Sequence, residues 1–266
     1  MSLVHLIVLA LIQGLTEFLP VSSSAHLILG SWLLGWPDQG LVTDVAVHFG
    51  TLIAVLYYFR ETLLGMLRSL TRSQPNPAAL QERKLAGYIV LASVPVILVG
   101  GLAHLWVEAY LRDVRVIAVC TLGFGLVLWV ADVWCARHRR LAELDLKSAL
   151  LIGLAQTLAL VPGVSRSGIT MTMGRMLGFD AGSAARFSFL LSIPVIAAAG
   201  AYGMMRMLDG SVTLDWAGFG LAVGFSALAG WACIAAFLAL LERIGLLPFV
   251  YYRLVLGTVL LYLVWV

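Results

Sequence analysis

Long apolar runs, separated by short polar connections, make up most of the chain. Six of these runs are long enough for a helix to cross the hydrocarbon core of a bilayer. Each is predicted to be a full span, and they lie at roughly 41–60, 85–106, 114–134, 184–206, 216–240 and 246–266. Backbone groups in lipid must be paired within the protein, and helices pair them locally, so we predict an all-α integral membrane protein.

Two further apolar regions, at roughly 4–35 and 148–178, are interrupted in the middle. The interruptions read Pro20-Val21-Ser22-Ser23-Ser24 and Pro162-Gly163-Val164-Ser165-Arg166-Ser167-Gly168. Because proline ends one helix and serine caps the next, each region is predicted to be a re-entrant helix–turn–helix hairpin with its tip inside the membrane. Irregular backbone at that depth is tolerated only inside protein or beside water, so the two tips predict a polar chamber.

Composition and charge support the same interpretation. Apolar residues make up 61% of the 266 residues and charged residues only 12%, a balance that a water-soluble domain does not need. The net charge of +3 is small and gathered in connections, which argues against nucleic acid as a partner and favours the lipid bilayer. The three cysteines have no metal-type spacing, so neither disulfides nor a zinc site is predicted.

Lysine and arginine predict the orientation in the membrane. Nine of the seventeen basic residues lie in two connections, residues 60–84 and 137–147, which the positive-inside rule places in the cytoplasm. Three full spans separate the two hairpins, so the first is expected to enter from the outside and the second from the inside. Their tips would then meet near the middle of the membrane.

The two halves of the chain also resemble each other. The segment Leu19-Pro20-Val21-Ser22-Ser23-Ser24 is echoed by Val161-Pro162-Gly163-Val164-Ser165-Arg166-Ser167, and residues 47–52 are echoed by 185–190. An odd number of intervening spans predicts an inverted-topology repeat. We expect one polytopic membrane domain, 1–266, with repeat 1 at about 1–112 and repeat 2 at about 148–266.

Glu17 is the first candidate functional residue. A carboxylate inside an apolar helix is costly unless it is solvated, paired or bound to a cation. Gln13 lies four residues earlier on the same helix face, where its amide oxygen and the carboxylate could serve one hydrated divalent ion, either Mg²⁺ or Ca²⁺. The alternative is that Glu17 only pairs with Arg166 and holds the two hairpins together.

The first tip also offers groups that suit an anion. Ser22, Ser23 and Ser24 at a helix start combine hydroxyls, free backbone N–H groups and the positive end of a helix dipole. His26 follows by one short turn and is expected to face the same chamber as Glu17. Ordinary capping by one serine, and a structural hydrogen bond from the histidine, are the alternatives.

Arg166 is the most informative charge of the second tip. Its guanidinium could grip a phosphate with two parallel hydrogen bonds. Ser165 and Ser167 flank it, Gly163 would let the backbone approach closely, and Thr170 could add a hydroxyl. Together the two tips would present a carboxylate, an imidazole, a guanidinium and several hydroxyls to one cavity, which suits phosphoryl transfer from an anionic lipid headgroup.

Two long motifs, in this order, resemble the signatures of the undecaprenyl-diphosphate phosphatase family that is linked to bacitracin resistance. The first is Gln13-Gly14-Leu15-Thr16-Glu17-Phe18-Leu19-Pro20-Val21-Ser22-Ser23-Ser24-Ala25-His26, and the second is Pro162-Gly163-Val164-Ser165-Arg166-Ser167-Gly168-Ile169-Thr170. The stretch Arg186-Phe187-Ser188-Phe189-Leu190-Leu191, the length and the span pattern agree as well. The resemblance therefore covers nearly the whole chain.

The resemblance implies hydrolysis of undecaprenyl diphosphate to undecaprenyl phosphate and inorganic phosphate, which recycles the lipid carrier of cell-wall synthesis and confers bacitracin resistance. It further implies a divalent cation, a location in the bacterial inner membrane and an active site open to the periplasm. By motif position, Glu17 would be the essential acid. Ser23, His26, Ser165 and Arg166 would act in catalysis or diphosphate binding.

One position departs from the family pattern in a way that matters for the cation. Gln13 stands where many relatives have a second glutamate, so a metal site here would carry one fewer negative charge. Whether Ser23 or His26 is the nucleophile stays open at this stage, and so does the formation of a homo-oligomer.

Two other functions compete with this interpretation. Inverted repeats with broken helices are also a transporter architecture, and a flippase for a polyprenyl phosphate lipid would use the same cavity. A lipid phosphatase of the phosphatidic-acid type would need a histidine after the Ser165-Arg166 pair, which the sequence lacks at that place. The transporter is the stronger of the two, and phosphate release distinguishes it from an enzyme.

Overall fold

The computed structural model describes residues 2–36, 40–74, 76–111, 113–209 and 215–265. The regular secondary structure of this part is helical, and one isolated bridge joins Arg139 and Phe179. The α-helices are α1 (Leu3–Thr16), α2 (Ser23–Leu34), α3 (Gly40–Tyr58), α4 (Arg60–Thr71), α5 (Pro77–Tyr110), α6 (Val114–Trp134), α7 (Leu146–Gln156), α8 (Arg166–Met176), α9 (Ala181–Asp209), α10 (Trp216–Ile244) and α11 (Leu247–Trp265). Two short 3₁₀ helices, η1 (Leu141–Glu143) and η2 (Thr157–Leu160), lie on either side of α7.

The six predicted spans are confirmed as helices long and apolar enough to cross a membrane. They are α3, α6, α10 and α11, together with most of α5 and α9. Helices α5, α9 and α10 run to 34, 29 and 29 residues, longer than the predicted apolar runs, because residues that flank those runs continue the helix. The chain is therefore an all-α, multi-pass membrane protein.

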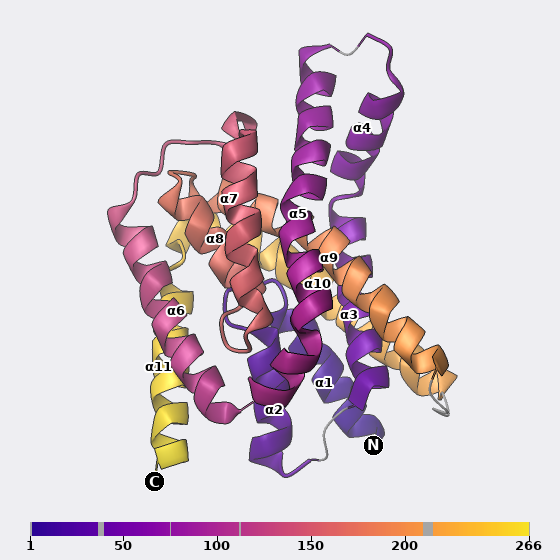
Figure 1. Cartoon of the computed structure of the whole chain (residues 1–266), viewed down its shortest axis with the longest axis vertical. Helices are drawn as coiled ribbons and strands as arrows, with labels where there is room; N and C mark the ends of the chain where they lie inside the picture. The colour runs from indigo at the N-terminus through magenta and orange to yellow at the C-terminus, as the bar shows by residue number, and fades with distance from the viewer. Residues whose placement is uncertain (1, 37–39, 75, 112, 210–214, 266) are drawn as a thin grey trace.

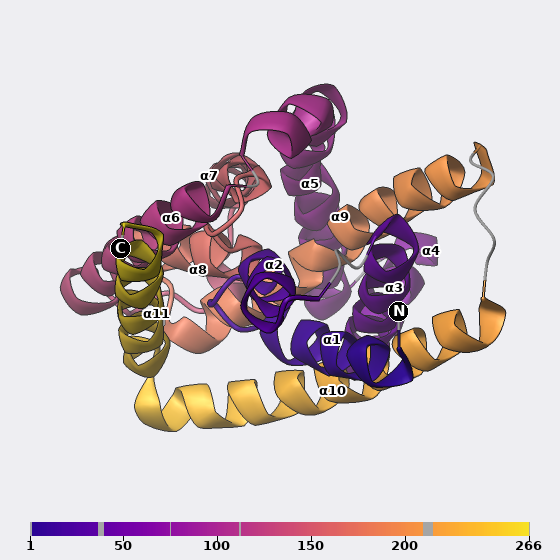
Figure 2. The same cartoon turned by 90° about the horizontal axis from the view of Figure 1, so that it is seen from below.

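The two interrupted regions form helix pairs that approach each other from opposite ends of the molecule (Figure 1). α1 and α2 come from the end that carries both termini, and α7 and α8 come from the other end. Seen along the long axis, α2 and α8 lie in the centre, with α6 and α11 on one side and α3 and α9 on the other (Figure 2). Their re-entry into a bilayer and the inverted repeat at 1–112 and 148–266 stay predictions.

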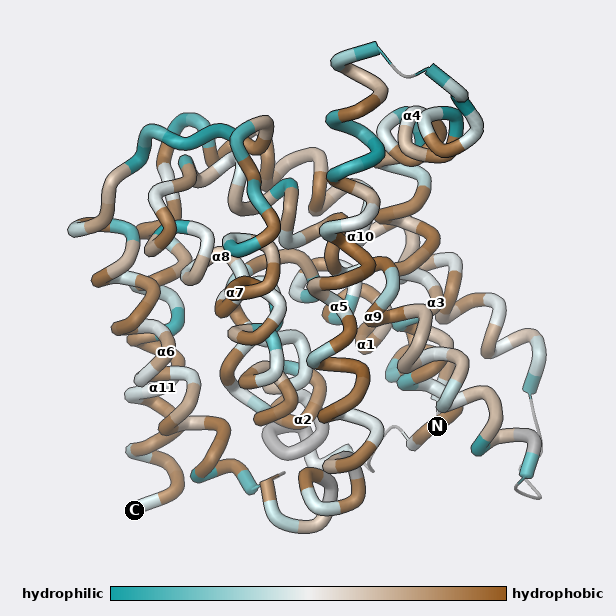
Figure 3. The backbone as a smooth tube through the Cα atoms, turned by 45° about the horizontal axis from the view of Figure 1, so that its top comes forward, coloured by the Kyte–Doolittle hydropathy of each residue, from teal (hydrophilic) through white to brown (hydrophobic). Residues whose placement is uncertain are grey.

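Polar residues gather at one end of the molecule, at the α4–α5 tip and in the connection between α6 and α7 (Figure 3). Both are the basic connections that the sequence assigns to the cytoplasm. The first was predicted as a loop over residues 60–84, which is wrong in part, since α4 and the start of α5 fill it. α4 packs on α5 through buried Met66 and Ser69, and Arg83 donates to the carbonyl oxygen of Ser69 at 3.1 Å.

The core surrounds the first tip. Phe18, directly after Glu17, is fully buried and meets Phe189 edge to face at 5.3 Å between ring centroids. Phe189 in turn packs against Phe237 of α10. α1 approaches α10 so closely at Gly14 that a Cβ there would lie 2.6 Å from the Cβ of Ala229, the small-residue contact that membrane helices use. The tip is thus held in a packed interior.

Candidate active site

Both tips use a serine with the same unusual backbone conformation. Ser22 and Ser165 have φ of 72° and 73°, and in the described part of the chain they are the only residues other than glycine with positive φ. Each precedes a helix, α2 or α8, and each hydroxyl lies near the hydroxyl two residues later, at 3.3 Å for Ser24 and 3.2 Å for Ser167. Such conformations cost free energy and gather at functional sites, which supports the assignment of both turns to the site.

Glu17 lies at the centre of the polar contacts between the tips, with 8% of its surface exposed. Its Oε2 accepts a hydrogen bond from the Ser23 hydroxyl at 2.7 Å and another from the Gln13 side-chain amide at 2.9 Å. Its Oε1 accepts from Arg166 Nη2 at 2.8 Å. Each carboxylate oxygen is therefore paired, which lets a charged group persist in an apolar interior.

Arg166 joins the second tip to the first. Besides its ion pair with Glu17, it donates from Nη1 to the carbonyl oxygen of Ser188 in α9 at 3.0 Å. Ser167 adds a second link, because its hydroxyl donates to the carbonyl oxygen of Leu19 at 2.7 Å. The predicted meeting of the acid and the guanidinium is confirmed, and it brings together residues 149 positions apart in the sequence.

A cavity of about 200 Å³, here called the tip cavity, opens between these groups. Its polar wall consists of Glu17, Ser22, Ser23, Ser24, His48, Ser165 and Arg166, and its apolar wall of Val96, Ala159, Leu160, Val195, Ile196 and Ala199. Six of the eleven residues predicted for the site thus line one space. The cavity combines one acid, one guanidinium and four serine hydroxyls, so it can bind a phosphate and move a proton.

His26 is not among the residues that line the tip cavity. Its Nδ1 lies 2.7 Å from the carbonyl oxygen of Ser22, so Nδ1 carries the proton, and Nε2 accepts from the Tyr252 hydroxyl at 2.5 Å. The expectation that His26 faces the same chamber as Glu17 is therefore wrong, because α2 turns this side chain toward α11. The imidazole in the cavity belongs to His48 of α3, whose Nδ1 bonds the carbonyl oxygen of Asp44 at 2.7 Å.

Three other residues predicted to bind substrate lie behind the cavity wall. Thr170 is fully buried, and its hydroxyl bonds Ser188 Oγ at 2.7 Å and the Arg166 carbonyl oxygen at 2.9 Å. The Ser167 hydroxyl is already engaged in its hydrogen bond to the Leu19 carbonyl oxygen. Gly163 faces α6, where a Cβ would lie 2.5 Å from the carbonyl oxygen of Ile117. In this structure they shape the second tip and touch no part of the cavity.

Arg253 of α11 is a residue that the sequence interpretation missed. It is fully buried, and within the described residues no carboxylate pairs with it. Its guanidinium instead donates to carbonyl oxygens of both tips and of α6. The acceptors are Pro20 at 3.3 Å, Gly163 at 2.9 Å, Val164 at 3.0 Å, Thr121 at 3.2 Å and Cys120 at 3.4 Å. One side chain thus ties the two turns to their surroundings.

The signal for Arg253 was present in the sequence. An arginine in the middle of the last predicted span carries the same cost that drew attention to Glu17. The same holds for Asp132 and Arg175, whose buried ion pair of 2.9 Å joins α6 to α8. The sequence does not identify the partners of Arg253, because every residue has a carbonyl oxygen and none is distinguished by its residue type.

The side chains of Gln13 and Glu17 at the first tip include oxygen atoms of the kind that a divalent cation prefers. In the residues that the structure describes, no three histidine, cysteine or acidic side chains form a metal-binding group. However, Oε1 of Gln13 is buried and accepts no hydrogen bond, which leaves an acceptor beside Glu17 without a partner. Mg²⁺ commonly takes one or two protein oxygens and completes its shell with water and phosphate oxygens. Gln13 and Glu17 are the residues that would hold such an ion.

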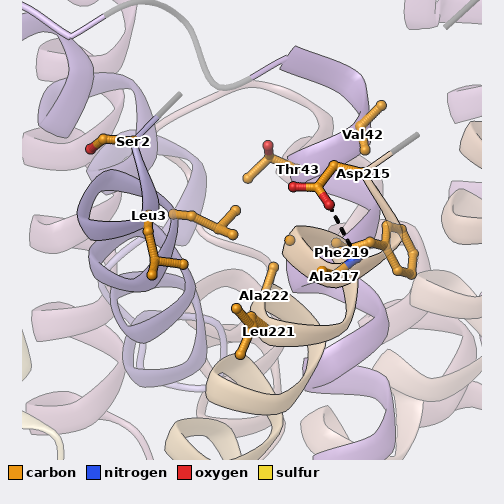
Figure 4. A pocket seen from close by; sticks show the side chains of 12 residues that line it. Ser2, Leu3, Val42, Thr43, Asp215, Ala217, Phe219, Leu221 and Ala222 are labelled. Carbon is orange, nitrogen blue, oxygen red and sulfur yellow. Dashed lines mark hydrogen bonds between the residues drawn. The ribbon is translucent and has the colours of Figure 1, made fainter. Parts of the chain in front are cut away.

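A cavity of about 360 Å³ near the start of α1 offers less chemistry (Figure 4). Its polar groups are Ser2, Thr43 and Asp215, in a wall made largely of Leu3, Leu221 and similar side chains. Asp215 already caps α10 by accepting from the backbone N–H of Ala217 at 3.1 Å, the dashed line in Figure 4. With no cationic lining residue, this space does not suit a phosphate.

The chain is similar to known proteins over nearly its whole length. The family model described as "Bacitracin resistance protein BacA" matches residues 6–259. The chain is 51% identical over 266 residues to "Undecaprenyl-diphosphatase 2" of Stutzerimonas stutzeri, covering 99% of this chain and 98% of that protein. It is 51% identical to "Undecaprenyl-diphosphatase 1" of Pseudoalteromonas translucida, with 97% of each chain covered, and 50% identical to "Undecaprenyl-diphosphatase" of Chromohalobacter salexigens over the full length of both.

Proposed function

The chain belongs to the bacitracin resistance protein BacA family, and on this basis we infer that it is an undecaprenyl-diphosphatase. It hydrolyses undecaprenyl diphosphate to undecaprenyl phosphate and inorganic phosphate, which returns the lipid carrier to cell-wall synthesis, and bacitracin resistance fits the family name. Its substrate is a polyprenyl diphosphate lipid within the membrane. The observation that carries the inference at the level of residues is the contact of Ser23, Glu17 and Arg166 in one cavity.

Ser23 and Glu17 have the arrangement of a nucleophile and its general base, because the hydroxyl donates directly to the carboxylate at 2.7 Å. In the first step, Ser23 Oγ attacks the terminal phosphorus and its proton passes to Glu17. The bond from that phosphorus to the bridging oxygen breaks, and undecaprenyl phosphate leaves. Water then cleaves the Oγ–P bond: its hydroxyl completes inorganic phosphate, its proton restores Ser23, and Glu17 returns its proton to solvent.

Two observations favour Ser23 over His26 as the nucleophile. Ser23 lines the tip cavity, whereas His26 does not. Both ring nitrogens of His26 are also engaged, one with the Ser22 carbonyl oxygen and one with the Tyr252 hydroxyl. His26 therefore acts by holding the turn at Ser22, next to the nucleophile.

Arg166 exchanges partners during binding. In the structure its Nη2 pairs with Glu17 Oε1, so the resting site is nearly neutral. An incoming diphosphate draws the guanidinium to its oxygens, which match the two-pronged donor geometry better than one carboxylate oxygen does. That exchange frees Glu17 to act as a base. Backbone N–H groups at the start of α8 add a further positive partial charge.

The test of this function is phosphate release by the purified protein in detergent with undecaprenyl diphosphate labelled with ³²P at its terminal phosphate. We expect labelled inorganic phosphate, and after rapid acid quenching an acid-stable label on Ser23 that disappears in Ser23→Ala. A transporter that binds the same lipid would release no phosphate. Release by the parent protein without label on any serine would refute the assigned nucleophile while leaving the hydrolase activity in place.

Gln13→Glu is expected to strengthen cation binding. We propose that a divalent cation at Gln13 and Glu17 lowers the negative charge of the bound diphosphate, and a second carboxylate would raise the affinity for that ion. The concentration of Mg²⁺ or Ca²⁺ at half-maximal activity, measured after chelation and stepwise readdition, should fall about tenfold by ligand charge count. Gln13→Leu should move it in the opposite direction. Equal values in the parent and both variants would contradict this role of Gln13.

The orientation follows from charge. We propose that the end with the basic connections faces the cytoplasm of a bacterium whose inner membrane holds the protein, and that the tip cavity is reached from the periplasm. The expected result is phosphate release by intact spheroplasts that receive the substrate from outside, at a rate that permeabilisation does not raise. A rate that appears only after permeabilisation would reverse the assigned sidedness.

A further inference from the structure

The tip cavity continues into a second, apolar space between α5 and α9. This space, here called the side groove, has a volume of about 400 Å³. Its lining shares Val96, Leu160, Val195 and Ala199 with the tip cavity, so the two spaces meet along a common wall. The other described cavities near Asp215, Arg175 and Gln81 share no lining residue with the tip cavity. Among the cavities described here, the side groove is therefore the one that adjoins the tip cavity with Glu17 and Arg166.

The lining of the side groove suits a hydrocarbon. Beyond the shared residues it consists of Ile97, Gly100, Gly101, Ala198 and Tyr202, and the Tyr202 hydroxyl is the single polar side-chain group among them. Ile97 and Tyr202 are 39% and 40% exposed on helices that span the membrane, so the groove reaches the lipid-facing surface. A chain that leaves the tip cavity here passes from a polar wall to an apolar one without crossing a charged residue.

Each wall of the groove contains an interruption of regular helix bonding where it meets the tip cavity. Pro95 in α5 and Pro194 in α9 each directly precede a shared residue, Val96 or Val195. A proline inside a helix lacks the N–H that would bond four residues back, and its ring pushes that carbonyl aside. The two prolines thus lie on α5 and α9 where the side groove meets the tip cavity.

We propose that the side groove binds the first isoprene units of the substrate's prenyl chain while the diphosphate lies in the tip cavity. The proposal rests on the function proposed above, since it needs a ligand with a diphosphate at one end and a long hydrocarbon at the other. Such a ligand must place an anion beside Arg166 and carry its apolar part away without burying it against polar groups. The shared wall provides that path, and the groove volume lies in the range of small-molecule sites.

Filling the groove tests the proposal. Gly101 is the best position, because a Cβ there meets no atom within 4 Å, whereas one at Gly100 would lie 3.3 Å from Leu160. Gly101→Leu should raise KM for undecaprenyl diphosphate about tenfold, the scale at which a mis-sized apolar group acts in a hydrophobic pocket, and Ala198→Leu should do so from the opposite wall. The inhibition constant of inorganic diphosphate, which has no chain, should stay as in the parent.

Two control substitutions introduce leucine into the same two helices at positions that do not line the side groove. Gly87→Leu lies on α5 where a Cβ is equally unobstructed, and Ala201→Leu lies on an exposed face of α9 outside the groove lining. Both should keep the parent KM. A Gly101→Leu protein with the parent KM, or controls that shift KM as much, would overturn the groove assignment while undecaprenyl diphosphate hydrolysis still stood.

A binding readout separates the groove from the activity. A prenyl diphosphate with a photoreactive diazirine on its second isoprene unit should label peptides from α5 and α9, and excess undecaprenyl diphosphate should compete. Labelling there without any phosphate release would support the groove and refute the hydrolase. Competable labelling confined to other helices would refute the groove, whatever the activity.

Discussion

Glu17→Gln is expected to lower kcat for phosphate release from undecaprenyl diphosphate by about a thousandfold, within the range that general acid–base groups supply. The amide keeps the size of the carboxylate and can still accept a hydrogen bond from Ser23, but it cannot take that proton. It also removes the charge that Arg166 pairs with in the resting site. Single-turnover measurement with labelled substrate reports the chemical step apart from product release.

The structural alternative, in which Glu17 and Arg166 only hold the tips together, makes a different prediction. Removing one partner of a buried pair leaves an uncompensated charge and costs about 3–5 kcal/mol, whereas replacing both can be nearly neutral. The double variant Glu17→Gln with Arg166→Gln should then regain both thermal stability and turnover. We expect it to regain stability only. Turnover near the parent rate in the double variant would show that the pair is structural.

Much of the fold follows from periodicity and length. The six spans could be predicted because an apolar run of about twenty residues has few other stable forms. The two tips could be predicted because a Pro followed by serines cannot continue a helix, and the cost of Glu17 and Arg166 in an apolar surrounding predicted their meeting. α4 was missed, since its basic face resembles a loop when only hydrophobic length is counted.

The parts that were missed depend on rotation and on backbone geometry. His26 and His48 both lie within a turn or two of polar residues, and the packing of α2 against α11 decides which one reaches the tip cavity. Ser22 and Ser165 adopt positive φ, which sequence predicts for glycine or asparagine and not for serine. Gly163 was expected to serve the substrate, but the close approach of α6 explains it as well.

Arg253 shows how a cation can be kept in an apolar interior without an acid. Its five hydrogen bonds go to carbonyl oxygens, three in the two turns and two in the middle of α6. The turn carbonyls lie outside the regular hydrogen bonding of a helix, so they need such a donor. Two of these acceptors, Gly163 and Val164, directly precede Ser165 and Arg166, and a third, Pro20, stands three residues before Ser23. The guanidinium therefore sets the distance between the two halves of the site.

Arg253→Met is accordingly expected to lower both stability and activity, with several kcal/mol lost because each unpaired buried acceptor costs about 1–3 kcal/mol. Methionine keeps the apolar stem but offers no donor. Arg253→Lys should recover part of the stability but little of the turnover, since one ammonium cannot reach carbonyl groups on both tips with the spread of a guanidinium. Thermal unfolding in detergent and kcat are the measurements.

The control for this prediction is Arg68→Met on the exposed face of α4, which should leave both quantities unchanged. The contrast between the two arginines follows from burial: a charge in water needs no partner in the protein, while the guanidinium of Arg253 is buried and depends on its carbonyl acceptors. If Arg253→Met kept the parent's unfolding temperature and turnover, the two tips would have to be positioned by the Glu17–Arg166 and Ser167–Leu19 contacts alone. In that event the hydrogen bonds from Arg253 to the carbonyl oxygens of the two tips would have no part in building the site.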